Sequence, residues 1–283
     1  MTRFVDAHVH PPLEEFLTGA FAPFVPGLEA FLGHPITPMT GDDLAALYRS
    51  ADGRAVLMAW DAGTATRRRA FGNAAVAAVV NAHPDVFVGF GSVDPLQGAA
   101  AVGGVYEARR LGLRGLLFHP PAQRFSPADR RVYPVWEVAQ QERLPVLIHT
   151  GFTALGAGTA GGGGIDLASG DPMLVDRVAT DFPGLQIIIG HPSGLWLEQA
   201  VAVARHKKNV FLELSGWVPG LMPPVLAEAV AGPLADRVVF GSGFPFGALE
   251  DPIEAWERAD LAPNLLEKIL HGNARRLLDL DDA

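Results

Sequence analysis

Two histidines near the start of the chain have the spacing of a metal-binding pair. Residues 4–10 read FVDAHVH, an alternating apolar run that indicates a β-strand. Every second side chain of a strand points to the same face, so Asp6, His8 and His10 share one face. Two neutral imidazoles on one strand can bind a single zinc ion. Ordinary packing produces the same pattern, so the pair alone does not decide between a metal site and a structural role.

The composition of the chain narrows the classes of partner and of metal ligand. The 283 residues contain no cysteine, so disulfides and thiolate ligands are excluded, and a metal would be held by histidine and carboxylate groups. A net charge of −9 provides no basic surface for nucleic acid or anionic membranes. No apolar run approaches the roughly 20 residues of a membrane span, and the first residues lead into a strand rather than a signal sequence. We therefore expect a soluble, cytoplasmic protein with a small-molecule substrate and no nucleic-acid or membrane partner.

The rest of the chain alternates between short apolar runs and stretches typical of helices. Seven further runs have the length and β-branched content of buried strands, at 55–60, 86–93, 113–118, 145–150, 186–190, 210–214 and 238–241. The helical stretches are 41–50, 66–82, 98–110, 128–142, 171–181, 195–207, 222–231 and 251–280. Eight such units predict an α/β protein with a single-domain (β/α)8 TIM barrel over residues 1–283, with a loop insertion at about 11–40. A doubly wound open sheet is the alternative, but no Gly-X-Gly-X-X-Gly follows the first strand.

Histidines at strand ends mark the region where chemistry is expected. In a TIM barrel the reacting groups lie at the carboxyl ends of the strands. Five of the nine histidines fall at such ends, which is more than scatter would place there: His8, His10, His119, His149 and His191. We expect ligand or catalytic roles for His149 and His191. For His119, which precedes two prolines, a substrate contact and a loop-shaping role are both open.

The order and spacing of four strand-end motifs resemble the amidohydrolase superfamily, in particular its amidohydrolase-related branch of aminocarboxymuconate-semialdehyde decarboxylase-like enzymes. The motifs are HVH at 8–10, LIHTG at 147–151, IGHP at 189–192 and FGSGFP at 240–245. The resemblance implies one divalent metal, zinc with manganese as the alternative, bound by His8, His10 and His149. It also implies that His191 acts as an acid, a base or a substrate-polarising group, and that the protein forms a homodimer.

One position departs from the family pattern in a way that bears on activity. The family places a metal-binding, proton-shuttling aspartate on strand eight, where this chain has Gly243. A second departure is Leu117, where relatives often carry lysine. Three interpretations stay open: an active enzyme in which another ligand replaces the aspartate, a non-catalytic small-molecule-binding barrel, and an inactivated variant of such an enzyme. Glu213 is a candidate replacement, although a structural, hydrogen-bonded role is equally consistent with its position.

Aromatic residues near the strand ends indicate an apolar substrate. Four phenylalanines of the insertion either wall a pocket or pack the insertion down: Phe16, Phe21, Phe24 and Phe31. The candidate substrate-binding residues are His119, Trp60, Trp217 and Glu213. Arg114 and Arg124 either pair with a substrate carboxylate or have a surface role. We expect either hydrolysis or non-oxidative decarboxylation of a small aromatic or apolar organic acid, and the sequence leaves the choice between these reactions open.

Overall fold

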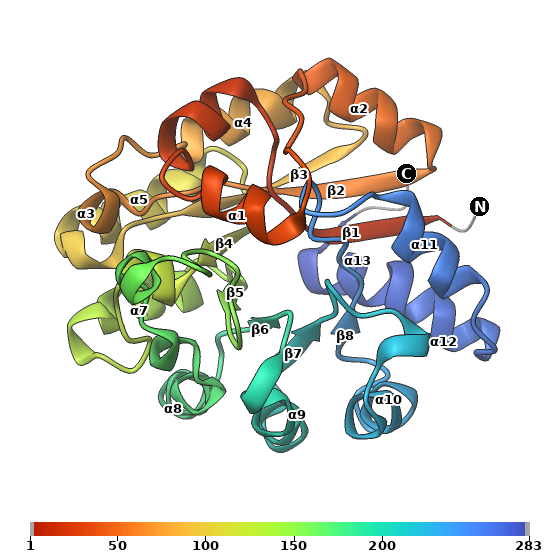
Figure 1. Ribbon diagram of the computed structural model, residues 1–283. Coiled ribbons are helices and arrows are strands. Elements are labelled where there is room, and N and C mark those ends of the chain that lie inside the picture. Colours follow the sequence, from red (N-terminus) through yellow and green to blue (C-terminus); the bar gives the residue numbers. More distant parts are fainter. Residues whose placement is uncertain (1–2, 281–283) are drawn as a thin grey trace.

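Eight parallel strands form one sheet in chain order in the computed structural model, which describes residues 3–280 (Figure 1). The strands are β1 (Phe4–Val9), β2 (Gly53–Met58), β3 (Phe87–Ser92), β4 (Gly115–Phe118), β5 (Val146–His149), β6 (Ile187–Gly190), β7 (Val210–Glu213) and β8 (Val238–Val239). Each strand pairs with the next one in parallel. The Ala7 N–H donates to the Phe240 carbonyl oxygen at 2.9 Å, which brings the chain after β8 against β1. The predicted TIM barrel is confirmed.

Helices connect successive strands and cover the outside of the barrel (Figure 1). They are α2 (Gly41–Ser50), α3 (Gly63–Thr66), α4 (Asn73–Ala82), α5 (Ala99–Arg110), α6 (Pro120–Gln123), α7 (Tyr133–Gln141), α8 (Pro172–Asp181), α9 (Leu197–His206), α10 (Pro224–Ala231), α11 (Glu250–Glu257), α12 (Pro263–Glu267) and α13 (Asn273–Leu278). Because helices cover one face of each strand and the barrel interior covers the other, the strands are buried almost throughout. This burial on both faces explains why the strands could be found as continuous apolar runs. No helix among residues 3–280 has both the length and the apolar character of a membrane-spanning segment.

The stretch at 66–82, predicted as one helix, is interrupted. Helix α3 ends at Thr66, and Arg67 has a left-handed backbone with a φ of 57°. The next helix begins only after Gly72, which is the N-cap of α4. Three consecutive arginines, at 67–69, therefore lie in the connection between the two helices.

The insertion at 11–40 is more regular than the predicted loop. It contains a π-helix, η1 (Phe16–Ala20), and a helix, α1 (Val25–Leu32). Pro26 stands in the first turn of α1, where its missing N–H has no intrahelical partner to lose, and Gly33 ends the helix with a φ of 77°. The prediction of an irregular segment is wrong here because the stabilisation comes from burial against the barrel, which a weakly periodic sequence does not reveal.

Candidate active site

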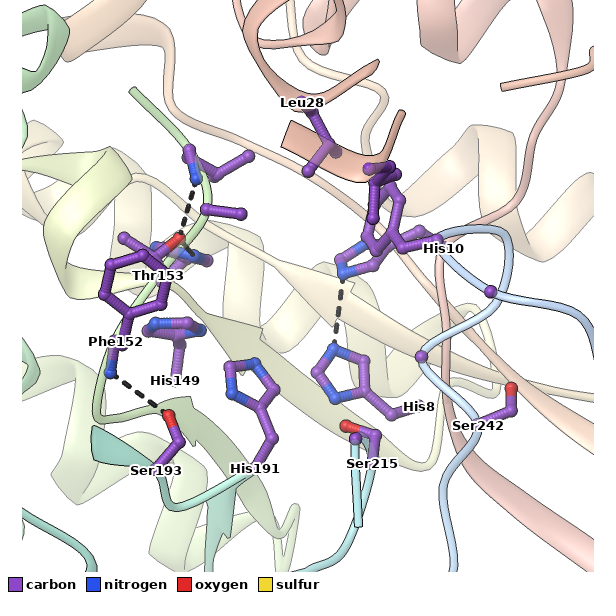
Figure 2. A pocket seen from close by; sticks show the side chains of 18 of the residues that line it. His8, His10, Leu28, His149, Phe152, Thr153, His191, Ser193, Ser215 and Ser242 are labelled. Carbon is purple, nitrogen blue, oxygen red and sulfur yellow. Dashed lines mark hydrogen bonds between the residues drawn. The ribbon is translucent and has the colours of Figure 1, made fainter. Parts of the chain in front are cut away.

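A cavity of about 550 Å³ opens at the carboxyl ends of the strands (Figure 2), and its lining includes all five strand-end histidines. His8 lies in β1 and His10 directly after it, while His149 ends β5. His119 and His191 follow β4 and β6. The remaining lining is mostly apolar and includes Phe21, Leu28, Phe31, Trp60, Leu117, Phe152, Leu155, Trp217 and Phe246. Within residues 3–280, no Asp, Glu, Lys or Arg lines this cavity.

His8 and His10 face each other inside the cavity wall. Their Nε2 atoms are 3.2 Å apart, and both side chains are buried. His8 Nδ1 lies 3.0 Å from Glu213 Oε2. Because a carboxylate only accepts hydrogen bonds, the proton of His8 is assigned to Nδ1 and its lone pair to Nε2. His10 Nε2–H can then donate to His8, and His10 Nδ1 is left buried with no hydrogen-bond partner among the described residues.

His119, His149 and His191 form a second group of imidazoles. The ring centroids of His119 and His149 are 3.8 Å apart with nearly parallel planes, and those of His149 and His191 are 4.3 Å apart. His191 also stacks on His8 at 5.5 Å, so it connects the two groups. His119 Nδ1 accepts a hydrogen bond from the Ala122 N–H at 3.2 Å and caps α6. His119 therefore both shapes its loop and lines the cavity.

Burial keeps most of these imidazoles neutral near pH 7. Burial and, to a smaller extent, the electrostatic effect of the neighbouring His191 lower the pKa of His119 to about 3. Burial, followed by the electrostatic effect of the neighbouring His8 imidazole, lowers the pKa of His191 to about 4. The pKa values of His10 and His149 also lie well below the ordinary value, mainly through burial. These side chains therefore offer lone pairs and N–H donors to a ligand rather than positive charge.

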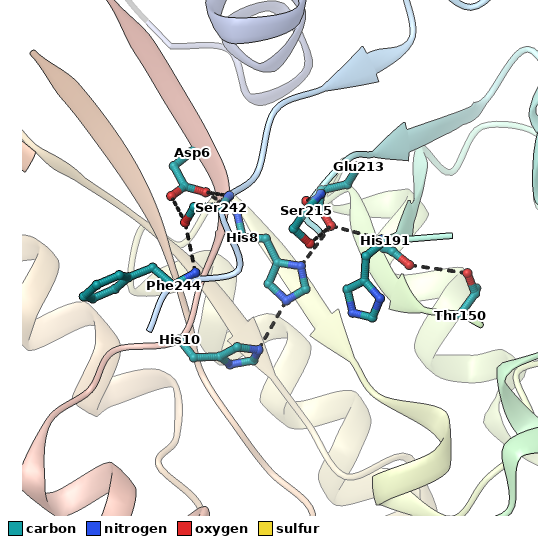
Figure 3. A network of polar contacts seen from close by, with 10 residues as sticks. Asp6, His8, His10, Thr150, His191, Glu213, Ser215, Ser242 and Phe244 are labelled. Atoms are coloured by element: carbon teal, nitrogen blue, oxygen red, sulfur yellow. Dashed lines mark hydrogen bonds and ion pairs between the residues drawn. The ribbon is translucent and has the colours of Figure 1, made fainter. Parts of the chain in front are cut away.

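Two buried carboxylates stand behind the cavity wall (Figure 3). Asp6 accepts hydrogen bonds from the Tyr48 hydroxyl at 2.6 Å and from the Ser242 N–H at 2.9 Å, so it joins β1 to the segment after β8. Burial raises the pKa of Asp6 to about 6, although these hydrogen bonds oppose the shift. Burial also acts to raise the pKa of Glu213, but the His8 imidazole and its hydrogen bond outweigh burial and hold that pKa below its usual value. Neither carboxylate lines the cavity, and Glu213, expected among the substrate contacts, instead supports His8.

The His8–His10 pair has the geometry to hold a divalent cation. Two nitrogens that bind one zinc ion at about 2.0–2.1 Å lie about 3–3.4 Å apart, which includes the 3.2 Å observed. A carboxylate on the second nitrogen of a ligating histidine is typical of metal sites, and Glu213 is placed in this way. His149 Nε2 is buried with no hydrogen-bond partner in the described part of the chain. Residues 3–280 contain no cluster of three or more His, Asp or Glu side chains that could hold a metal, so His149 as the third ligand stays a prediction.

Gly243 lines the cavity with a left-handed backbone, at a φ of 68°. A Cβ atom built there would contact only Ser215, 3.5 Å from its Cβ. Space therefore exists for a side chain at this position, and aspartate tolerates the left-handed conformation better than most residues. Leu117, the second departure from the family pattern, also lines the cavity and keeps its wall uncharged.

Some of the other residues predicted to bind substrate line the cavity, and the rest lie outside its wall. Trp60, Trp217, Phe21 and Phe31 line the cavity, and their contact with a substrate stays a prediction. Phe16 packs behind the wall with its ring stacked on Phe21 at 4.8 Å. Neither Arg114 nor Arg124 lines the cavity, and Arg124 donates to the Gly163 carbonyl oxygen at 3.2 Å. The lining residues that sequence reasoning missed include Leu28, Phe152, Ser193 and Phe246. Of these, Phe152 stands three residues after His149, so its place beyond a strand end was an available signal.

Comparisons with known proteins place the chain in a family. The family model described as Amidohydrolase matches residues 5–280. An uncharacterized TIM-barrel protein from Bordetella bronchiseptica is 26% identical with a TM-score of 0.80, over 98% of this chain and 99% of that chain. A 2,6-dihydroxybenzoate decarboxylase solved with 2,6-dihydroxybenzoate is 20% identical with a TM-score of 0.72, over 99% of this chain and 100% of that chain. A dihydroxybenzoic acid decarboxylase from Polaromonas sp. JS666, solved with bound manganese and an inhibitor, is 21% identical with a TM-score of 0.70, over 100% of this chain and 98% of that chain. None of the curated proteins matches the sequence. Because the family model spans nearly the whole barrel, the chain belongs to the Amidohydrolase family.

Proposed function

We propose that this member of the family is a non-oxidative decarboxylase of a small aromatic or apolar organic acid. The observation that carries the proposal is the composition of the cavity: histidines form one part of its wall, and aromatic and aliphatic side chains form most of the rest. No charged side chain of residues 3–280 takes part in the wall. The names of two similar solved structures, which are decarboxylases of dihydroxybenzoic acids, support an aromatic acid as the substrate.

The size and polarity of the cavity favour an acid with one charged group. A volume of about 550 Å³ is within the range of sites that bind small molecules. Phe21, Trp60 and Phe246 offer apolar surface to an aromatic ring. A second charged group on the substrate would be buried against these side chains without a partner, which is energetically costly. We place the single carboxylate at the histidines, where N–H donors are available.

Decarboxylation breaks the bond between the substrate carbon and its carboxyl carbon, releases CO₂ and leaves an electron pair that takes up a proton. A divalent cation held by His8 and His10, with His149 as the third proposed ligand, would orient the carboxylate and withdraw charge from it. Zinc and manganese are both candidates. We assign the proton transfer to His191, because its ring contacts those of His8 and His149 and lines the cavity. The apolar wall limits access of water to the reacting carbon.

Hydrolysis is the less favoured reaction. It requires a base that takes a proton from the attacking water, a role that carboxylates often fill. Gly243 has no side chain to do so, and Glu213 is fully buried behind His8. Decarboxylation requires a proton at carbon instead, which the neutral His191 ring can give from its N–H to the electron-rich carbon, regaining a proton from solvent.

A panel of aromatic monocarboxylic acids tests the proposal. The protein is supplied with zinc or manganese, and CO₂ release and loss of the acid are measured; in D₂O, the product should carry deuterium at the carbon that lost its carboxylate. His191→Gln should lower the rate at least about 100-fold, whereas His206→Gln, an exposed histidine in α9, serves as the matched control. Hydrolysis of esters or lactones, without CO₂ release from any acid, would replace the proposal with the hydrolase interpretation.

A non-catalytic small-molecule-binding barrel is the second candidate. It is favoured by the finding that no three metal-ligating side chains gather among residues 3–280. Gly243→Asp separates the two candidates, because the surrounding space accepts a side chain there and aspartate tolerates the left-handed backbone better than most residues. An acid that binds the unaltered chain without turnover, but is turned over by the Gly243→Asp variant, would support the binding barrel. Turnover by the unaltered chain would reject it.

A further inference from the structure

One carboxylate oxygen joins three strands beneath the cavity (Figure 3). Glu213 Oε2, at the end of β7, accepts hydrogen bonds from His8 Nδ1–H at 3.0 Å and from the His191 N–H at 3.1 Å. It also accepts from the Ser215 hydroxyl at 3.0 Å, while Oε1 accepts from the Ser215 N–H at 2.6 Å. The side chain is fully buried, so no water competes for these donors. Both oxygens of the carboxylate therefore accept hydrogen bonds, and the donors come from β1 and from the segments that follow β6 and β7.

The segment after β8 leaves room for this carboxylate only because it has a glycine beside it. A Cβ atom built on Gly241 would lie 2.0 Å from Glu213 Oε1 and 3.2 Å from the His8 Cβ. Such a distance is incompatible with any side chain unless Glu213 moves. The first glycine of the GSG segment at 241–243 thus fits the Glu213 carboxylate between β1 and β8.

The carboxylate determines which nitrogen of His8 is available to the cavity. Because Glu213 holds the proton on Nδ1, the lone pair of His8 is on Nε2, the atom that faces His10 Nε2. The same oxygen holds the backbone of His191, which has an unusual positive φ of 31° for a residue with a side chain. Through these two bonds, Glu213 sets the tautomer of one cavity histidine and the backbone position of another.

We propose that Glu213 is a positioning residue that prepares His8 and His191 for ligand binding, without contacting the ligand itself. The effect on catalysis rests on the proposed function, whereas the effect on the His8 tautomer does not. In the protein without metal, we expect the His8 ring proton on Nδ1, beside Glu213 Oε2, and the lone pair on Nε2. Loss of the carboxylate leaves the His8 proton free to occupy either nitrogen.

Nitrogen NMR on histidine-labelled protein tests the tautomer directly. The ¹⁵N shifts of protonated and unprotonated ring nitrogens differ clearly, and the His8 signals are identified by their loss in a His8→Gln variant. The unaltered, chelator-treated chain should show the Nδ1–H form of His8. Glu213→Leu, which removes both acceptors at similar volume, should convert this single form into a mixture that includes Nε2–H. Glu213→Asp, which keeps a shorter carboxylate, should partly restore the Nδ1–H form.

Asp6→Asn is the matched control, because Asp6 is also a fully buried carboxylate but does not touch the His8 imidazole. It should leave the His8 tautomer unchanged. A His8 protonated at Nε2 in the unaltered chain would overturn the proposal, even if Glu213→Leu failed to fold. A folded Glu213→Leu variant with an unchanged His8 tautomer would overturn it as well.

Metal titration supplies a second readout that is independent of turnover. Removal of a carboxylate that supports a ligating histidine typically lowers metal affinity about 10–100-fold. We expect a loss of this size for zinc or manganese in Glu213→Leu and not in Asp6→Asn. If Glu213→Leu changed the His8 tautomer but not the metal affinity, the effect of Glu213 would be limited to the imidazole. That result would contradict its role in preparing the site for ligand binding. If the His8 tautomer and the metal affinity change as expected but no acid is decarboxylated, the proposed function is rejected and the positioning role of Glu213 stands.

Discussion

His8 and His10 approach each other through their Nε2 atoms at 3.2 Å although both side chains are buried. Because this separation suits one shared cation, we expect protein purified without chelator to contain close to one zinc or manganese ion per chain. His8→Ala and His10→Ala should each lower the metal content at least about tenfold, since each removes one of the two nitrogens. Elemental mass spectrometry checks this, with His206→Ala as the control. Equal metal content in all four proteins would locate the metal elsewhere.

Phe31 and Phe152 should contribute to substrate affinity at the cavity mouth. Their ring centroids are 6.0 Å apart, both line the cavity, and they are 55% and 42% exposed. We expect Phe152→Ala to raise the KM or Kd for aromatic acids about 5–30-fold, which corresponds to roughly 1–2 kcal/mol of lost apolar contact, with little change in kcat. Leu221→Ala is the control, because Leu221 is 70% exposed and does not line the cavity. An unchanged KM would show that the substrate does not reach the mouth.

Gly241 and Gly243 should respond differently to the same substitution. A methyl group on Gly241 would collide with the Glu213 carboxylate, so Gly241→Ala should destabilise the fold by about 3 kcal/mol. At Gly243 the methyl group has space, and only the left-handed backbone opposes it, which costs about 1–2 kcal/mol. Urea unfolding measures both values. Equal losses would mean that the Glu213 carboxylate moves aside at little cost.

Asp61 should make the stability of the fold depend on pH. Burial, with a smaller contribution from the neighbouring charge of Asp94, raises its pKa above the ordinary 3.8. A group with a raised folded-state pKa stabilises the fold at low pH and loses that contribution as pH rises through the folded pKa. Asp61→Asn, which keeps an oxygen for the Gly63 N–H, should therefore raise the Tm at pH 7, and the gain should shrink towards pH 4. Thermal unfolding across this range checks the prediction, and a gain that grew on acidification would contradict its sign.

The parts of the site that sequence could predict are those fixed by the barrel itself. A strand end has a defined place in a TIM barrel, so His149 and His191 could be assigned to the cavity from their position after an apolar run. Leu28 could not, because it reaches the cavity from a helix whose packing depends on the whole barrel. Glu213 was placed on the correct strand, but whether its carboxylate faced the ligand or the neighbouring strands depended on the space beside Gly241. Such space is a three-dimensional property that periodicity does not encode.

The helical insertion has a consequence for how specificity can change in evolution or by engineering. Its two ends lie together, since the Met39 N–H donates to the Pro12 carbonyl oxygen at 2.8 Å. The segment between them supplies Leu28 and Phe31 to the cavity wall but no strand to the sheet. A recombination event or a designed graft that replaces residues 13–38 would exchange one wall of the pocket while the histidines stay on their strands. The insertion can thus change substrate specificity independently of the histidines. Homologues that differ mainly there should differ in substrate range more than in the reaction that they catalyse.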